Sequence, residues 1–145
     1  MAGLRFDDAM PRVISAKMHG IIDYIHAGTN ILVGALLWKR NKRAATGAFI
    51  LGGHVLANAL LTDYEMGVFR LYSFKMHGIL DYATAATSAA MPAMLGITGT
   101  PEANFFYAQG GGESVIAGIS DYDDDRGAQR TGERLDDRMR MPQVA

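Results

Sequence analysis

Four apolar segments alternate with short polar stretches along this chain, and each has the length of a helix rather than of a strand. The pattern predicts helices over 17–38, 43–61, 74–97 and 103–119. The second segment carries no charge from Ala44 to Leu61, so it lacks the polar face that a helix on a soluble bundle needs. At ~1.5 Å per residue, such a segment approaches the ~30 Å hydrocarbon core of a bilayer. The pattern therefore favours an all-α fold, an integral membrane four-helix bundle, over a water-soluble bundle.

A motif of eight residues occurs twice, as KMHGIIDY from Lys17 and as KMHGILDY from Lys75, an offset of 58 residues (75 − 17 = 58). The triplets TDY from Thr62 and SDY from Ser120 have the same offset. The chain is therefore an internal duplication with two apolar segments in each copy. An even number of spans predicts two tandem helical hairpins that enter the membrane from one side, related by an axis along the membrane normal. The expected division is an N-terminal polar or interfacial segment (1–16), repeat one (17–64), repeat two (75–122) and a polar C-terminal tail (123–145).

The composition and the first residues of the chain limit the expected partners and chemistry in three ways. A net charge of −1 and a pI of about 6.4 give no basic face, so a nucleic-acid partner is not expected. The absence of cysteine excludes disulfides, thiolate ligands and cysteine nucleophiles. The first residues lack the apolar core of a secretory signal and carry Asp7 and Asp8 instead. The expected partners are the lipid bilayer and either further copies of the chain or a larger membrane complex.

The stretch LTDYEMGVFRLYSFKMHGILDYATAATSAAMPAMLGI, at 61–97, resembles the bacterial SPW-repeat class of small integral membrane proteins. Members of that class carry a TDYE-like element, then a basic-x-His-x-x-x-Asp helix that ends in Ser-Pro-Trp. Pro92 and Gly96 match this pattern, whereas Met91 and Ala93 stand where the class has Ser and Trp. The resemblance implies a four-helix protein of the bacterial inner membrane, and it implies no activity.

Each predicted helix carries polar residues at helical spacing. Spacings of three and four residues keep such residues on one face of a helix. Since an unpaired polar group in lipid costs several kcal/mol, these faces are expected to turn toward one another. In chain order the four sets are His19, Asp23, His26 and Asn30; His54 and Asn58; His77, Asp81, Thr84 and Ser88; and Gln109 and Glu113.

A structural role explains this polarity most simply. Because both repeats enter the membrane from one side, their KMHGI-x-DY and TDY/SDY motifs should meet in one ring of polar residues. Within each motif helix, the histidine and the aspartate four residues later are expected to form a hydrogen bond that fixes the imidazole tautomer. At the helix ends, Lys17 and Lys75 are expected to pair with Asp63 and Asp121. The predicted structural ring comprises Lys17, Asp23, Asp63, Tyr64, Lys75, Asp81, Asp121 and Tyr122.

A cofactor site is the first alternative, with His19 and His77 as the binding residues. They are the histidines retained in both repeats, and each has an aspartate one turn onward that would orient it from the outer shell. Gly20 and Gly78 would leave room for a flat ligand such as haem or chlorophyll, and a metal is the other candidate. A proton or ion path along the polar faces is the second alternative.

The sequence therefore predicts a noncatalytic accessory or scaffolding subunit of a membrane assembly, with no catalytic residue and no cofactor required. The alternative function is a cofactor-binding redox or ion-conducting membrane protein that uses the His/Asp ring. His26 and His54 have no histidine counterpart in repeat two, so we expect them to be core histidines paired with Asn30 or Asn58. Glu113 reads either as a buried acid or as a carboxylate that faces water.

Overall fold

The computed structural model of this protein describes residues 11–124. It contains four helices, which confirms the all-α prediction, and two very short strands. The elements in order are α1 (Ala16–Leu37), α2 (Lys42–Leu61), β1 (Thr62–Asp63), β2 (Tyr72–Ser73), α3 (Phe74–Leu95) and α4 (Ala103–Ile119). The parts of the predicted terminal segments at 1–10 and 125–145 lie outside the described residues.

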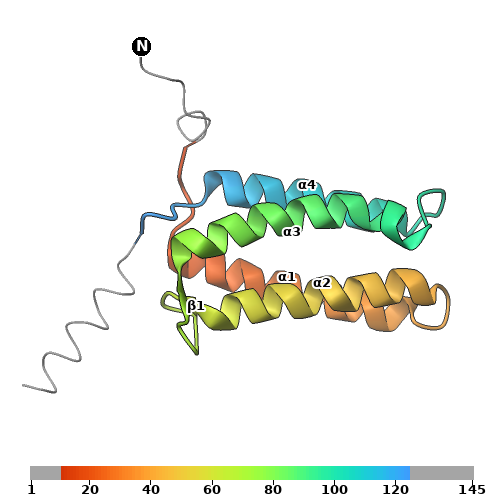
Figure 1. The fold of residues 1–145 in the computed structure, drawn as a ribbon, viewed down its shortest axis with the longest axis horizontal. Helices are drawn as coiled ribbons and strands as arrows, with labels where there is room; N and C mark the ends of the chain where they lie inside the picture. The colour runs from red at the N-terminus through yellow and green to blue at the C-terminus, as the bar shows by residue number, and fades with distance from the viewer. Residues whose placement is uncertain (1–10, 125–145) are drawn as a thin grey trace, which may run out of the picture.

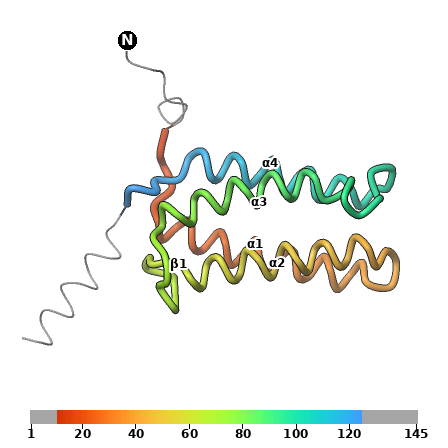
Figure 2. The backbone as a smooth tube through the Cα atoms, viewed as in Figure 1, coloured from red at the N-terminus to blue at the C-terminus, as the bar shows by residue number. Residues whose placement is uncertain are grey.

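The helices form two hairpins that lie side by side, α1 with α2 and α3 with α4 (Figure 1). α2 also packs against α3, which joins the hairpins to one another. The backbone trace has both hairpin loops at one end of the molecule, while β1 and the described chain ends lie at the other (Figure 2). All segments that carry the KMHGI and TDY/SDY motifs therefore meet near the β1 end.

Local sequence defines where the helices begin and end. The side chain of Ser15 accepts a hydrogen bond from Met18 N, and Ser73 accepts one from Met76 N, both at 3.3 Å. These N-caps satisfy amide groups that the first turn leaves unpaired, and they start α1 and α3 directly before the KMHGI motifs. α3 stops two residues before the predicted end, because Gly96 adopts a left-handed backbone conformation at φ 65°.

Backbone pairing ties the end of each hairpin to the beginning of the other. β1 pairs with β2 in parallel, with Thr62 opposite Tyr72. A single parallel bridge joins Ile14 to Ser120 at the other side of the bundle. Each residue of this bridge stands 58 positions from a residue of the β1–β2 pair, so the two connections correspond to one another.

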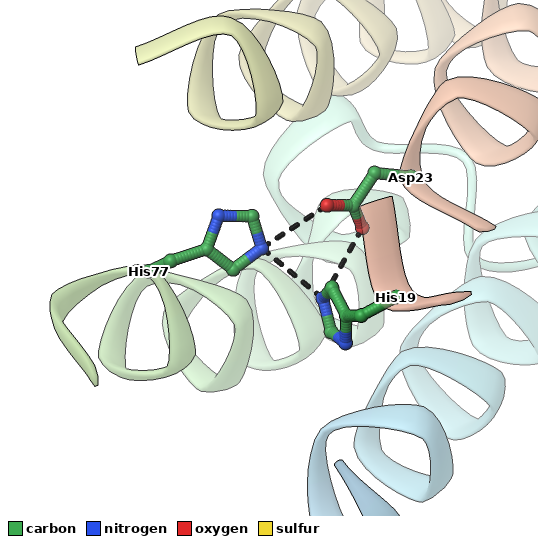
Figure 3. Close-up of side chains that lie close together, drawn as sticks. All are labelled: His19, Asp23 and His77. Carbon is green, nitrogen blue, oxygen red and sulfur yellow. Dashed lines mark hydrogen bonds and ion pairs between the residues drawn. The ribbon is translucent and has the colours of Figure 1, made fainter. Parts of the chain in front are cut away.

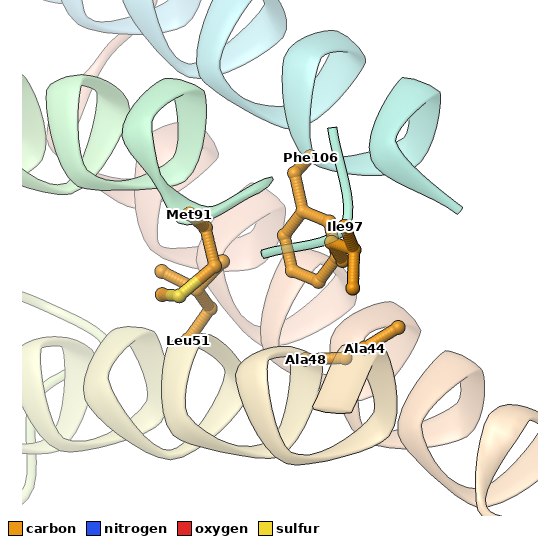
Figure 4. Packing of buried hydrophobic residues seen from close by; sticks show 6 residues of the cluster. All are labelled: Ala44, Ala48, Leu51, Met91, Ile97 and Phe106. Carbon is orange, nitrogen blue, oxygen red and sulfur yellow. The ribbon is translucent and has the colours of Figure 1, made fainter. Parts of the chain in front are cut away.

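An apolar core fills the half of the bundle near the hairpin loops (Figure 4). Alanines on α2 allow Met91 of α3 and Phe106 of α4 to come close to the α2 backbone, and these side chains are almost fully buried. The buried cluster consists of Ala44, Ala48, Leu51, Met91, Ile97 and Phe106.

The outer surface is apolar along much of its length. Ile25, Leu36, Ile50 and Ile79 are more than half exposed, although each is a strongly apolar residue. Two of the helices, α1 and α2, are long and apolar enough to cross a membrane by length and composition. The buried face, by contrast, contains histidine, aspartate, asparagine and threonine side chains.

Candidate metal centre

Two histidines from different hairpins meet at the β1 end of the bundle. His19 on α1 and His77 on α3 face one another with 3.1 Å between their Nε2 atoms. Their exposed fractions are 1% and 0%, so neither ring reaches solvent. Figure 3 shows the two imidazoles pointing at each other, with the carboxylate of Asp23 beside both.

Two aspartates contact the same pair of nitrogens. Asp23 has one oxygen 3.3 Å from His19 Nε2 and the other 3.1 Å from His77 Nε2. Asp81 has one oxygen 3.1 Å from His77 Nε2 and the other 3.1 Å from His19 Nε2. The expected His-x-x-x-Asp contact within each helix is present, and it is matched by a contact across to the other hairpin. Both carboxylates therefore contact the Nε2 atoms, which are the atoms that a ligand would bind, rather than the Nδ1 atoms on the other side of each ring.

The opposite nitrogen of each ring is held by a hydroxyl group. Thr62 Oγ1 lies 2.7 Å from His77 Nδ1 and donates its own hydrogen to the carbonyl of Asn58 at 2.6 Å. Ser120 Oγ lies 2.7 Å from His19 Nδ1 and donates to the carbonyl one turn earlier at 2.7 Å. Since each hydroxyl hydrogen is already used, each hydroxyl accepts from an Nδ1–H group. The Nε2 atoms thereby face each other and the carboxylates.

Tyrosines and an asparagine surround the carboxylates as donors. Tyr122 donates to Asp81 Oδ2 at 2.7 Å, Tyr64 to Asp23 Oδ2 at 3.4 Å, and Asn58 Nδ2 to Asp81 Oδ1 at 3.1 Å. Burial, reinforced by the neighbouring carboxylate, raises the pKa of the Tyr64 and Tyr122 hydroxyls. Both phenols therefore stay protonated as donors, which fixes the orientation of the carboxylates.

The space beside Gly20 and Gly78 is filled by these tyrosines. A Cβ at Gly20 would lie 2.7 Å from Tyr64 Cε2, and one at Gly78 would lie 2.8 Å from Tyr122 Cε1. The expectation that these glycines leave room for a flat ligand is therefore wrong. A haem between the histidines would also hold their nitrogens about 4 Å apart, twice a metal–nitrogen bond of about 2 Å, whereas they lie 3.1 Å apart.

The substitution Gly78→Ala should destabilise the protein, because the new methyl group meets the ring of Tyr122 within contact distance. We expect a loss of about 1–3 kcal/mol in the free energy of unfolding. Gly28→Ala is the matched control, since nothing lies within 4 Å of a Cβ there. That control should gain roughly 0.5–1 kcal/mol in helix propensity. Thermal melting compares the two, and equal stabilities would contradict the close packing of Tyr122.

The cluster brings two Nε2 atoms and two carboxylates into direct contact, with separations of 3.1–3.3 Å. The 3.1 Å between the Nε2 atoms is close to the distance of about 3.3 Å between ligands in a tetrahedral site with bonds of about 2.0 Å. Each carboxylate presents one oxygen to each nitrogen. Ligand atoms of His19, Asp23 and His77 all lie within 4.8 Å of one another. Two protons or one divalent ion would each balance the two carboxylates. Imidazole with carboxylate suits zinc and other first-row divalent metals.

Four charged residues of the predicted ring lie outside this cluster, toward the surface: Lys17, Asp63, Lys75 and Asp121. Lys17 and Lys75 are 59% and 70% exposed and do not pair with Asp63 and Asp121 as expected. The acidic partners of the two lysines are instead Glu65 and Asp123, because the polypeptide turns after each TDY or SDY triplet. Each partner lies two positions further along the chain than the expected aspartate. The ion pairs are Lys17 with Glu65 (3.6 Å), Lys75 with Asp123 (2.7 Å), Arg70 with Asp63 (3.8 Å) and Arg12 with Asp121 (3.9 Å).

Two site residues, Thr62 and Ser120, are not among the residues predicted from the sequence. They open the repeated TDY and SDY triplets, and this repetition is the sequence signal that marks them. The expected asparagine partner of His26 is also wrong, and so is the expectation that His54 lies in the core, because His54 is exposed. His26 Nδ1 contacts Glu113 Oε2 at 2.8 Å, and Glu113 is buried rather than facing water.

No protein-family model, curated protein or solved structure matches this chain.

Proposed function

We propose that this protein is a small noncatalytic membrane protein whose buried cluster binds one divalent transition metal, such as zinc. His19, His77, Asp23 and Asp81 are the proposed ligands. The observation that carries this proposal is the contact of two Nε2 atoms at 3.1 Å while both Nδ1 atoms are engaged with hydroxyl groups. Two Nε2 atoms at that distance, flanked by two buried carboxylates, need compensating positive charge, and a divalent cation between them would supply it.

A structural rather than catalytic role follows from how closed the site is. Each proposed ligand residue is 3% exposed or less. Phe74 packs between the rings of Tyr64 and Tyr122, with centroid distances of 5.5 and 4.8 Å, and it also contacts His19. Four protein ligands complete a tetrahedral shell, whereas catalytic zinc sites keep one position open. The metal would then clamp α1 to α3, one helix from each tandem hairpin.

The membrane setting is part of the same proposal. Strongly apolar side chains cover the outside of the bundle, while the inside holds the histidines, aspartates and asparagines. An apolar outer surface together with buried polar side chains suits a protein in lipid. We propose that all four helices span the membrane, although α1 and α2 are the two that meet the length and composition criteria. Trp38, 48% exposed beside the basic hairpin loop, suits an interfacial anchor.

The biological role that we propose is that of an accessory or scaffolding subunit. A metal-clamped bundle of this size is rigid, and its exposed apolar faces suit contact with lipid, with further copies or with a larger membrane complex. The SPW-repeat resemblance of residues 61–97 belongs to this proposal, as does a bacterial inner membrane location.

The simpler structural interpretation uses two protons in place of the metal. Both carboxylates are buried, so the metal-free cluster needs two positive charges, and protons on both Nε2 atoms supply them. Metal ligation requires neutral imidazole. Exchange of two protons for one divalent ion keeps the cluster neutral in both states.

Titration of metal-stripped protein with zinc in detergent tests the proposal. We expect one ion to bind per chain and about two protons to be released into a weakly buffered solution, because both Nε2 atoms must lose their hydrogens. His54→Gln is the matched control, since His54 is exposed and outside the cluster. That variant should release the same two protons. No saturable binding, or binding without proton release, would refute the metal assignment and leave the proton-only cluster.

A further inference from the structure

Basic side chains gather at the loop that connects α1 to α2, at the end of the bundle opposite β1 (Figure 2). Four of the five residues at 39–43 are basic, namely Lys39, Arg40, Lys42 and Arg43. Arg40 forms an ion pair with Glu102 at 3.1 Å. Within residues 11–124, no acidic side chain forms an ion pair with any of the other three bases.

The bases at the β1 end are compensated by acidic side chains. Their ion pairs are Arg12 with Asp121 and Asp123, Lys17 with Glu65, Arg70 with Asp63, and Lys75 with Asp123. In the part of the chain that the structure describes, uncompensated lysine and arginine side chains are therefore confined to the α1–α2 loop.

Two of these bases stand where a helix disfavours positive charge. Lys42 and Arg43 are the first residues of α2, directly after the N-cap Asn41, and the first turn contains no acidic residue. The N-terminus of a helix already carries partial positive charge. The α3–α4 loop has Thr100 and Pro101 at the corresponding positions, so a hairpin closes without bases there. An anion from outside the chain would offset the charge of the α1–α2 loop.

Exposed apolar side chains adjoin the bases on α1. Leu32 and Leu36 are one helical turn apart, and both are more than half exposed. The half-exposed ring of Trp38 lies between these leucines and the bases in sequence, with Lys42 Nζ 5.8 Å from its centroid, a cation–π contact. A soluble phosphate would meet the bases alone. A phospholipid would meet the bases with its head group and the leucines with an acyl chain.

We propose that the α1–α2 loop selects anionic phospholipids from the surrounding bilayer. The lipid phosphate lies among Lys39, Lys42 and Arg43, and an acyl chain lies along Leu36 and Leu32. Each base near an anionic membrane surface strengthens such an attraction about fivefold. The inference rests on the proposed membrane setting, and it does not depend on the metal.

Fluorescence of Trp38 tests this proposal directly, because it is the single tryptophan of the chain. The full chain is reconstituted into mixed vesicles of phosphatidylcholine and phosphatidylglycerol, with dibrominated acyl chains on one lipid or on the other. Bromine quenches the indole when that lipid lies beside it. We expect quenching that corresponds to at least about fivefold higher affinity for phosphatidylglycerol at 0.1 M salt. In 1 M salt, where the screening length falls to about 3 Å, this preference should shrink toward one.

Lys39→Gln combined with Arg43→Gln should reduce the preference to within about twofold of phosphatidylcholine, while Trp38 and Lys42 stay in place. Lys17→Gln combined with Lys75→Gln is the matched control. It removes the same charge at the β1 end, where both lysines already have acidic partners, and it should leave the preference unchanged.

The outcomes separate this proposal from the membrane setting on which it rests. If neither brominated lipid quenches Trp38, the ring is not in contact with lipid, and both proposals fail. Equal quenching by the two lipids, or an undiminished preference in a folded variant that lacks Lys39 and Arg43, overturns the lipid selection alone. Loss of the preference when inorganic phosphate replaces chloride at equal ionic strength would assign the bases to a soluble anion instead.

Discussion

Replacing His19 by glutamine together with Asp23 by asparagine should abolish stoichiometric metal binding while leaving a folded protein. The pair is removed as a neutral unit, so the remaining His77 and Asp81 still balance one another in the absence of metal. Only two of the four proposed metal ligands then remain. Since loss of an outer-shell partner alone typically costs 10–100-fold in metal affinity, we expect a loss of at least about 100-fold. Elemental analysis and zinc titration of the purified variant measure it.

The second copy of the KMHGI-x-DY motif provides an internal replicate of this experiment. His77→Gln with Asp81→Asn removes the equivalent pair from α3 and should cause the same loss. His54→Gln should bind metal as the wild-type protein does, because its imidazole is exposed and lies outside the cluster. Stoichiometric, tight binding in either double variant would show that the ion, if present, is held elsewhere.

Removing the metal with a chelator should lower the melting temperature by roughly 10 °C. An ion held at about a thousandfold excess over its dissociation constant stabilises the native state by about 4 kcal/mol. For a domain of this size, each kcal/mol corresponds to roughly 2–4 °C. The effect is large because the proposed ligands join α1 and α3, and the bond between the hairpins weakens when the ion leaves.

Re-addition of zinc should restore the melting temperature, whereas magnesium should not, because magnesium prefers an octahedral shell of oxygen ligands. The double variant that lacks His19 and Asp23 should be insensitive to both chelator and zinc. A wild-type melting temperature that stays constant through stripping and reloading would contradict the proposed clamp.

Much of the helical framework was predictable because the apolar pattern and its boundaries are local properties. Predicted and observed helices agree within two residues at every end, and α4 agrees at both. The 58-residue offset, which is long-range information written in the sequence, also predicted that His19 and His77 would face one another. Pairing within a helix, such as His19 with Asp23, follows from spacing alone.

The other contacts of the site depend on how the two hairpins pack against each other, and the spacing of residues along the sequence does not specify this packing. Each aspartate also reaches the histidine of the other hairpin, a contact that requires the side-to-side placement of α1 and α3. Thr62 and Ser120 reach the rings from the ends of α2 and α4. Their offset of 58 residues marks them as repeated, but it does not show that they contact the histidines. The contact of His26 with Glu113 has no counterpart in the other interface, so the repeat could not reveal it.

X-ray absorption at the zinc edge, recorded on protein purified and incubated with one equivalent of zinc, tests the proposed metal site. We expect a single shell of nitrogen and oxygen at about 2.0 Å with the outer-shell pattern of two imidazoles and no sulfur. A spectrum of hydrated zinc, or a bound ion with fewer than two imidazoles, would contradict it.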